Sequence, residues 1–192
     1  MNNYEYIIAS LPDIDKENKS DLYIDATREF IHSQLSEKDN SLCAMFESGF
    51  DCANLDKDFY AKALESSNSY IRNFFRFDLA LRNCKVRFIN RELERPSDMD
   101  ILDIPGWQEH EDMDRIEAAF TGKNLLSREK AIDELVWNKS EDLVLNHIFD
   151  LDIILSFLTR LNIVGRWLGL DKETGMKLFR KLIEELNASY TI

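Results

Sequence analysis

The chain has 192 residues, with 24 Lys or Arg against 36 Asp or Glu and a formal net charge of −12. This acidity argues against nucleic acid as a main partner, because proteins bind phosphates through basic surfaces. It also disfavours direct docking on an anionic membrane surface, so a basic protein partner fits the charge better. The length fits one domain, and a hydrophobic fraction of 44% with 12 Phe allows a sizeable core.

Cysteine usage and hydropathy predict a cytosolic protein without a membrane segment. The three cysteines, Cys43, Cys52 and Cys84, are odd in number and have no metal-type spacing, which is typical of a reducing compartment. The most apolar late stretch, Ile153–Leu170, is interrupted by Arg160, Gly165 and Arg166 and is no candidate for a membrane span. We therefore expect no direct membrane insertion.

The chain begins with a short apolar segment, Tyr4–Leu11, that ends at Pro12. Its aromatic and β-branched residues allow a strand, but no second convincing strand lies nearby to pair with it. A first helical turn packed on the rest of the chain fits equally well. The segment has no basic n-region, and its apolar run is too short for a signal peptide.

Two short helices are expected next. Apolar residues at helical spacing predict a helix over Asp25–Leu35. Ser36 precedes an acidic first turn and marks the start of a second helix, for which Gly49 is the candidate terminator. Glu29 and His32 have the Glu-x-x-His spacing of di-iron bundles, but such a site needs two of these motifs and two further Glu. The chain supplies only half of that set, so we expect no metal.

The longest helical pattern is Ser66–Arg95, which contains no Pro and no Gly. Its apolar residues recur at alternating steps of four and three, which places them on one face of a helix. A helix of this length spans roughly 45 Å at about 1.5 Å per residue, so we expect it to be the central element. The apolar face consists of Tyr70, Phe74, Phe77, Leu81, Cys84 and Phe88.

This central helix is basic, unlike the chain as a whole, and it supplies the first candidate site residues. They are Arg76, Asp78, Arg82, Asn83 and Arg87. Arg76 and Asp78 stand next to apolar positions and are expected to be partly buried. Internal pairing is the first interpretation, because an unpaired buried charge costs free energy. The alternative is that Arg82, Asn83 and Arg87 face a partner protein.

An acidic segment follows the central helix. Pro96 ends the helix, because the residue before a Pro is pushed out of the α region. Residues 98–117 then carry eight Asp or Glu against one Arg. Within this stretch, Asp112–Phe120 is expected to form a short helix that Gly122 closes. The spacing of Asp98, Asp100 and Asp103 suggests calcium, but the stretch lacks the Gly and the closing Glu of an EF-hand, so we expect a solvated loop.

Three helical stretches are expected to close the chain. The first starts at Ser127, the second is Leu151–Leu168 and ends at Gly169, and Asp171 caps the third. The third helix has an inward stripe that consists of Leu178, Phe179, Leu182, Ile183 and Leu186.

The remaining candidate residues lie in this C-terminal part. Trp137 and Trp167, with Arg166, are expected to be core or interface anchors rather than ligand platforms. His147 lies near Asp150 and Asp152 in the sequence, which predicts polar pairing at a helix junction. No nucleophile accompanies them, and no Gly-rich phosphate loop occurs anywhere in the chain. The sequence therefore predicts no enzyme and no cofactor.

These patterns predict an all-α protein, an irregular array of helices around one long central helix, with the N-terminal segment as the one candidate extended element. We expect a single helical domain over residues 1–192. The alternative is two lobes, about 1–95 and 124–192, joined by the acidic segment 96–123.

Four stretches carry a resemblance: YEYIIASLPDI at the start, FDLALRN at Phe77–Asn83, FDLDIILSFLTRLNIVGRW at Phe149–Trp167, and LFRKLIEEL. Together they resemble a bacterial family of unknown function whose genes are typically encoded beside V/A-type ATPase subunits. The Phe-Asp-x-x-x-Arg-Asn of the central helix is also similar to the Phe-Glu-x-x-x-Arg-Asn region of the C-type subunit of those ATPases, named d in eukaryotes. The C-type subunit has three similar helical lobes, whereas this chain has room for about two.

The resemblance implies a non-catalytic subunit or accessory protein that links the central stalk to the membrane ring. Its partners would be central-stalk or ring subunits, and the protein would be cytoplasmic and peripheral to the membrane through the ATPase. The acidic stretch Asp98–Glu117 would be the contact surface. The residues that would be mainly scaffold are Arg76, Asp78, Arg82, Asn83, Trp137, Arg166 and Trp167. The alternative function is an acidic helical adaptor that binds a basic protein, and an enzyme or metal protein is a distant third.

Overall fold

The computed structural model describes residues 4–15, 23–105, 112–122, 124–169 and 180. Within these residues the chain forms eight α-helices, one short 3₁₀ helix and no strand, which confirms the all-α prediction. The elements are α1 (Glu5–Ser10), α2 (Ile24–Gln34), α3 (Glu37–Ser48), η1 (Cys52–Asn54), α4 (Lys57–Leu64), α5 (Ser69–Glu92), α6 (Met113–Ala119), α7 (Leu125–Asp142) and α8 (Leu151–Leu168). The helix expected from Asp171, with its apolar stripe, lies outside the described residues.

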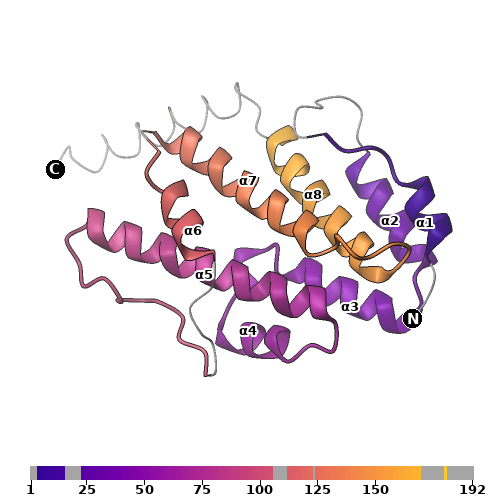
Figure 1. Ribbon diagram of the computed structural model, residues 1–192, viewed down its shortest axis with the longest axis horizontal. Helices are drawn as coiled ribbons and strands as arrows, with labels where there is room; N and C mark the ends of the chain where they lie inside the picture. Colours follow the sequence, from indigo (N-terminus) through magenta and orange to yellow (C-terminus); the bar gives the residue numbers. More distant parts are fainter. Residues whose placement is uncertain (1–3, 16–22, 106–111, 123, 170–179, 181–192) are drawn as a thin grey trace.

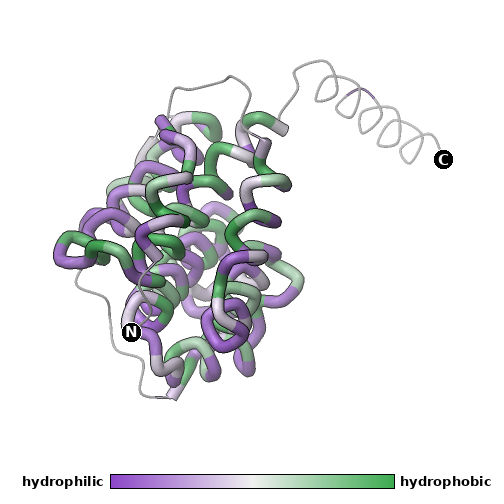
Figure 2. The backbone as a smooth tube through the Cα atoms, turned by 90° about the vertical axis from the view of Figure 1, so that its right-hand side faces the viewer, coloured by the Kyte–Doolittle hydropathy of each residue, from purple (hydrophilic) through white to green (hydrophobic). Residues whose placement is uncertain are grey.

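The longest helix, α5, is the central element that the sequence predicts. It runs along the molecule with α4 packed on one side and α6 and α7 on the other (Figure 1). α7 and α8 pack against each other, and α8 also contacts α2 and α3. Figure 2 shows hydrophobic and hydrophilic residues alternating along the helices, the pattern of helices that turn one side to a core.

α5 is shorter at both ends than the predicted Ser66–Arg95. It begins after Asn68, whose side chain accepts a hydrogen bond from the backbone N–H of Ile71 at 2.9 Å. It ends in a Schellman motif, in which the Arg95 N–H reaches the Asn90 carbonyl at 2.8 Å and Glu94 adopts a left-handed φ of 53°. The C-terminal cap therefore ends α5, and it does so before the chain reaches Pro96.

The main hydrophobic core combines residues from the N-terminal and C-terminal parts of the chain, including Tyr4, Ile31, Phe46, Phe75 and Leu158. Phe46 of α3 is fully buried and lies at its centre. Gly49 ends α3 as predicted, and a Cβ at this position would lie 2.5 Å from Cζ of Phe75. A side chain at this position would collide with the Phe75 ring, so a glycine is required at the end of α3. The core therefore contains residues from both segments, about 1–95 and 124–192, that the sequence analysis gives as alternative lobes.

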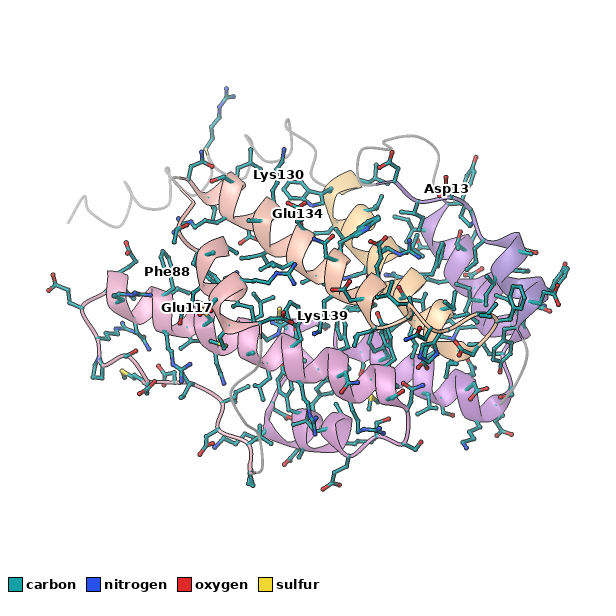
Figure 3. The ribbon with its side chains drawn as sticks, viewed as in Figure 1. Asp13, Phe88, Glu117, Lys130, Glu134 and Lys139 are labelled. Atoms are coloured by element: carbon teal, nitrogen blue, oxygen red, sulfur yellow. The ribbon has the colours of Figure 1, made fainter. Side chains whose placement is uncertain are left out.

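A second cluster covers the C-terminal half of α5, and it consists of Phe77, Ala80, Leu81, Cys84, Ile116 and Phe120. Phe88 of α5 stacks on the Phe120 ring with the ring centroids 5.6 Å apart, and Arg128 of α7 lies over the Phe88 ring at 5.0 Å (Figure 3). Cys84 is buried as a small apolar residue, and all three cysteines are free thiols.

The N-terminal segment is a helix, so the strand alternative is wrong. Tyr4 precedes α1, and its backbone N–H donates to the Phe149 carbonyl at 2.7 Å. The Tyr4 hydroxyl donates to the Asp39 carboxylate at 2.5 Å. These contacts join α1 to α3 and to the loop before α8.

Two further helix starts refine the prediction. Ser36 caps α3 through the Asp39 N–H, as expected. α7 begins earlier than the predicted Ser127, because Asn124 and Ser127 form a reciprocal capping box. The short helix expected over Asp112–Phe120 is α6. No described helix combines the length and the apolar character that a membrane crossing requires.

Candidate protein-interaction site

Residues 96–105, which we call the acidic strap, return along α5 and are held by its side chains. Asn83 is buried and forms two hydrogen bonds with one backbone unit: its Nδ2 donates to the Leu102 carbonyl, and its Oδ1 accepts from the Leu102 N–H, both at 2.9 Å. These two hydrogen bonds take the place of those that an extended backbone would make to a neighbouring strand in a sheet. Asn83 is therefore an internal anchor and does not face a partner.

Two more residues of α5 hold the strap on the same helix face, since residues four and seven positions apart lie above one another. Asn90, also buried, donates from Nδ2 to the carbonyls of Ser97 at 3.1 Å and Met99 at 2.6 Å. Arg87 donates from Nε to the Asp98 carboxylate at 3.0 Å. The strap therefore runs antiparallel to α5, and Ile104 anchors its far end in the main core.

The strap presents its carboxylates to solvent on this tethered backbone. Asp98 is 70% exposed in spite of its pair with Arg87. Asp100, which adopts a left-handed φ of 64°, and Asp103 are exposed and make no ion pair or hydrogen bond among the described side chains. Glu117 of α6 is also exposed and lies beside the C-terminal half of α5 (Figure 3). The arrangement offers fixed negative charge to a cationic surface.

Replacing Asn83 by Ala is expected to lower the free energy of unfolding by about 2 kcal/mol, because it leaves the N–H and carbonyl of Leu102 without partners. The strap should also become sensitive to proteolysis near Asp100. Thermal melts and limited proteolysis would measure both effects. Arg76→Ala is the matched control on the same helix, and an equal response of the two variants would contradict the anchoring role.

Asp78 and Arg82 pair with each other, as the first interpretation of the charges proposes. The Asp78 carboxylate accepts from Arg82 Nε at 2.7 Å and from the Tyr60 hydroxyl of α4 at 2.5 Å. Burial, the largest single influence, lowers the pKa of the Arg82 guanidinium, but the Asp78 carboxylate, Tyr60 and Cys52 together raise it by more, so the net shift is upward. Burial and the same carboxylate raise the pKa of Tyr60. These groups join α4 to α5.

Arg76 differs from the expectation of partial burial. It is exposed, and it makes no hydrogen bond or ion pair within the described parts of the chain. Its neighbours Phe75 and Phe77 fill the two apolar clusters. The side chain at position 76 falls between those clusters on the helix and points to water. Of the five candidates on α5, Arg76 is the one with no internal role among the described residues.

Trp137, Glu141 and Arg160 form one polar contact across the α7–α8 seam. Trp137 is buried, and its Nε1 donates to the Glu141 carboxylate at 2.9 Å. Arg160 of α8 lies over the Trp137 ring at 5.7 Å and approaches Glu141 at 3.6 Å. Trp137 is therefore a core anchor whose N–H is satisfied, as buried indoles require.

A second contact, formed by Asp133, Arg166 and Trp167, lies about one turn before Trp137 on α7. The Asp133 carboxylate pairs with the Arg166 guanidinium and accepts from Trp167 Nε1 at 2.6 Å. Burial raises the pKa of Asp133, and the Arg166 charge and the Trp167 hydrogen bond offset only part of that rise. Arg166 also reaches Glu129 at 3.7 Å, and Glu129 pairs with Lys85 of α5 at 3.4 Å. These residues hold α8 on α7.

His147, Asp150 and Asp152 come together at a helix junction, which confirms the predicted polar pairing. His147 Nδ1 lies 2.6 Å from the Asp150 carboxylate and 3.6 Å from that of Asp152. The buried Asp152 carboxylate also accepts from Asn68 Nδ2 at 2.5 Å and from the Ser69 hydroxyl at 3.4 Å. The cluster ties the start of α8 to the start of α5. Neither this cluster nor any other in the described part of the chain groups His, Cys, Asp and Glu as a metal site would.

The Glu29–His32 pair does not form a joint site. Glu29 is exposed, whereas His32 lies between Asn40 at 2.5 Å and the Glu47 carboxylate at 2.6 Å. Arg28 also pairs with Glu47, at 3.3 Å. His32 therefore joins α2 to α3.

Sequence reasoning missed Asn90, which holds the strap, and Asp133, which joins α7 to α8. A signal existed for Asn90, because it follows Asn83 by seven residues and thus shares its helix face. Asp133 had no such signal, since its partner Arg166 lies 33 residues away. Asp152 was predicted to pair with His147, but its contact with Asn68, 84 residues away, had no signal either.

Comparisons with known proteins bear on part of the expected resemblance. No curated protein and no solved structure matches the chain. The resemblance expected at residues 4–14 and 77–83 lies outside the matched part. Residues 107–190, which include α6, α7 and α8, match the family described as Protein of unknown function (DUF2764).

Proposed function

We propose that this protein is a non-catalytic subunit or accessory protein of a V/A-type ATPase, similar to the C-type subunit, which links the central stalk to the membrane ring. The observation that carries the proposal is the acidic strap, whose exposed carboxylates are tethered to the central helix by Asn83, Arg87 and Asn90. The link to the C-type subunit itself rests on the short motif in α5.

The internal roles of the motif residues support this proposal. Phe77 is buried in the second cluster, Asp78 and Arg82 pair with each other, and Asn83 holds the strap. The resemblance implies that these residues are scaffold. A scaffold that fixes an acidic strap on a long helix suits a mechanical role, because a tethered backbone loses little further conformational entropy on binding.

The proposed mechanism is electrostatic and mechanical. A basic end of the central stalk would meet Asp98, Asp100 and Asp103, and the helical body would pass the force on without chemistry of its own. Exposed ion pairs contribute little individually, so several carboxylates are needed, and binding should weaken as salt rises. In this proposal the protein is cytoplasmic and peripheral to the membrane through the ATPase.

An acidic helical adaptor for a different basic protein is the second candidate. The observation that favours it is the same set of exposed carboxylates, which would attract any complementary cationic surface. The two candidates differ in the proteins that co-purify with the chain. The experiment is a tagged pull-down from the native cell at low and moderate salt, read by mass spectrometry.

Central-stalk or ring subunits should be recovered with the wild-type chain, and the double variant Asp100→Asn/Asp103→Lys should recover about tenfold less. The variant removes two negative charges and adds one positive charge, a net change of three units, each contributing about 0.5 kcal/mol at an exposed site. Asn tolerates the left-handed backbone at position 100.

The matched control is Asp25→Asn/Glu29→Lys, which makes the same charge change at exposed positions of α2. It should recover the subunits as the wild type does. Absence of these subunits from the wild-type pull-down, under conditions that keep the ATPase intact, would reject the ATPase proposal in favour of the adaptor. Equal losses in both variants would reject the strap as the contact surface.

A further inference from the structure

A groove lies between α3 and the turn that joins α4 to α5; we call it the α3–α4 groove. Its volume is about 730 Å³, which is within the range of small-molecule sites. The groove shares no lining residue with the acidic strap. The described lining residues are Lys38, Ser41, Leu42 and Met45 of α3, and Lys62, Glu65, Ser66 and Ser67 at the end of α4 and in the turn.

The fold fixes both walls of the groove. Positions 38, 41, 42 and 45 recur at helical spacing, so one side of α3 faces the groove. Leu42 and Met45 on that side are half-buried and pack against the main core. In the turn, Arg72 of α5 donates from Nη1 to the Ser66 carbonyl at 2.5 Å, and the Ser66 hydroxyl accepts from the Asn68 N–H at 3.3 Å. A groove with fixed walls lowers the cost of ordering on binding.

The cations at the groove have no carboxylate partner in the described chain. Lys38 and Lys62 are exposed, line the groove themselves and make no ion pair or hydrogen bond with a described residue. Arg72, behind the turn, donates to the Ser66 carbonyl and makes no ion pair with a described residue either. Among the described lining residues, Glu65 is the one carboxylate, and it is exposed. Three cations against one carboxylate leave an excess of two positive charges, although the chain as a whole has a net charge of −12.

This excess charge matches a phosphate monoester, which carries about −1.5 to −2 at pH 7. Charge-assisted hydrogen bonds from Lys38 and Lys62 would hold its oxygens. The hydroxyl of Ser67 makes no hydrogen bond with a described residue, so its proton is free for a phosphate oxygen. An apolar group on the same molecule would lie over Leu42 and Met45. A polyanion or an anionic membrane fits less well, because the acidic chain around the groove would repel it.

We propose that the α3–α4 groove binds a small phosphate monoester that carries an apolar group. The phosphate would lie between Lys38 and Lys62, and the apolar group would cover the half-buried floor. The inference goes beyond the proposed function and does not depend on it, because the groove and the acidic strap are separate surfaces of opposite charge.

The test is a calorimetric titration of the full chain with octyl phosphate, below the concentration at which it forms micelles. The wild type should bind it, and Lys38→Gln/Lys62→Gln should bind about tenfold more weakly, because two ionic contacts are lost. The melting temperature of this variant should stay unchanged, since both side chains are exposed and unpaired. Glu65→Gln should bind at least as tightly as the wild type, because it removes a negative charge from the groove.

The matched control is Lys57→Gln/Lys130→Gln, which makes the same charge change at exposed positions that do not line the groove. It should bind octyl phosphate as the wild type does. No binding to the wild type, or equal binding to the wild type and Lys38→Gln/Lys62→Gln, would overturn the proposal. So would an equal loss in the control variant, which would indicate attraction set by the net charge alone.

Three further ligands test the two parts of the proposed molecule and its source. Inorganic phosphate and 1-octanol should each bind more weakly than octyl phosphate, and equal binding of either would overturn the proposal. Wild-type binding to phosphatidic acid vesicles that Lys38→Gln/Lys62→Gln loses would replace the free small molecule by a lipid surface. The pull-down tests the ATPase proposal separately, because stalk subunits can be recovered through the strap whether or not the groove binds octyl phosphate.

Discussion

Replacing Phe46 by Ala is expected to lower the free energy of unfolding by about 3–5 kcal/mol, a large part of the stability of a typical domain. Phe46 is fully buried in α3, and its ring contacts four others with centroids between 5.1 and 5.7 Å away. The neighbouring rings are Phe50, Tyr70, Phe74 and Phe75. Truncation would remove the aromatic contacts and leave a cavity between α3 and α5 that helices held elsewhere cannot fill.

Urea unfolding and thermal melts would measure this loss, which corresponds to a fall in Tm of roughly 6–20 °C for a chain of this size. Phe149→Ala is the matched control, because Phe149 is 41% exposed. It should cost less than about 1 kcal/mol. Similar losses in the two variants would show that Phe46 is not at the centre of a tightly packed core.

Replacing Asp152 by Ala is expected to cost about 3 kcal/mol, the second largest effect. The buried carboxylate accepts hydrogen bonds from Asn68 and Ser69 at the start of α5 and lies 3.6 Å from the His147 ring. Its removal leaves the half-buried Asn68 amide and the Ser69 hydroxyl without this acceptor, and it frees Asn68, whose side chain caps α5. One substitution therefore weakens both the start of the central helix and the loop before α8, where His147 lies.

Denaturant unfolding would measure the loss in Asp152→Ala. Asp152→Asn keeps one acceptor oxygen and should show an intermediate loss, while Asp142→Ala, at an exposed position, should be close to the wild type. A stability for Asp152→Ala equal to that of Asp142→Ala would contradict the role of Asp152 as the link between α5 and α8.

The local sequence pattern was enough to predict most of the helices. Apolar spacing predicts α2, α5 and α8, because one buried side of a helix requires a period that is visible in any sequence. The caps of α3 were also predictable, because each acts on residues a few positions away. Ser36 accepts a hydrogen bond from a free backbone N–H in the first turn, and Gly49 ends the helix. The predicted end of α5 was too late, because the left-handed turn at Glu94 has no glycine to signal it.

The candidate site was predictable only in part. Arg82 and Asp78 are one helical turn apart, so their pairing was visible in the sequence. For Asn83 a partner-facing position stayed open as the alternative to an internal role, because its contact Leu102 lies in a loop with no periodic pattern. Arg166 and Trp167 share the Asp133 carboxylate of another helix, which no local spacing indicates.

The sequence by itself determined the helical class, the central helix and the negative charge of the chain, because helix period, helix breakers and net charge are properties of neighbouring residues or of composition. Only the tertiary structure decided which polar residues are internal and which surfaces are free. Asn83 and Asp152 find partners 19 and 84 residues away, whereas the Arg76 side chain makes no hydrogen bond or ion pair in the described chain and the Leu145 side chain is 76% exposed. Burial and pairing depend on which helices meet, and that follows from the packing of the whole core.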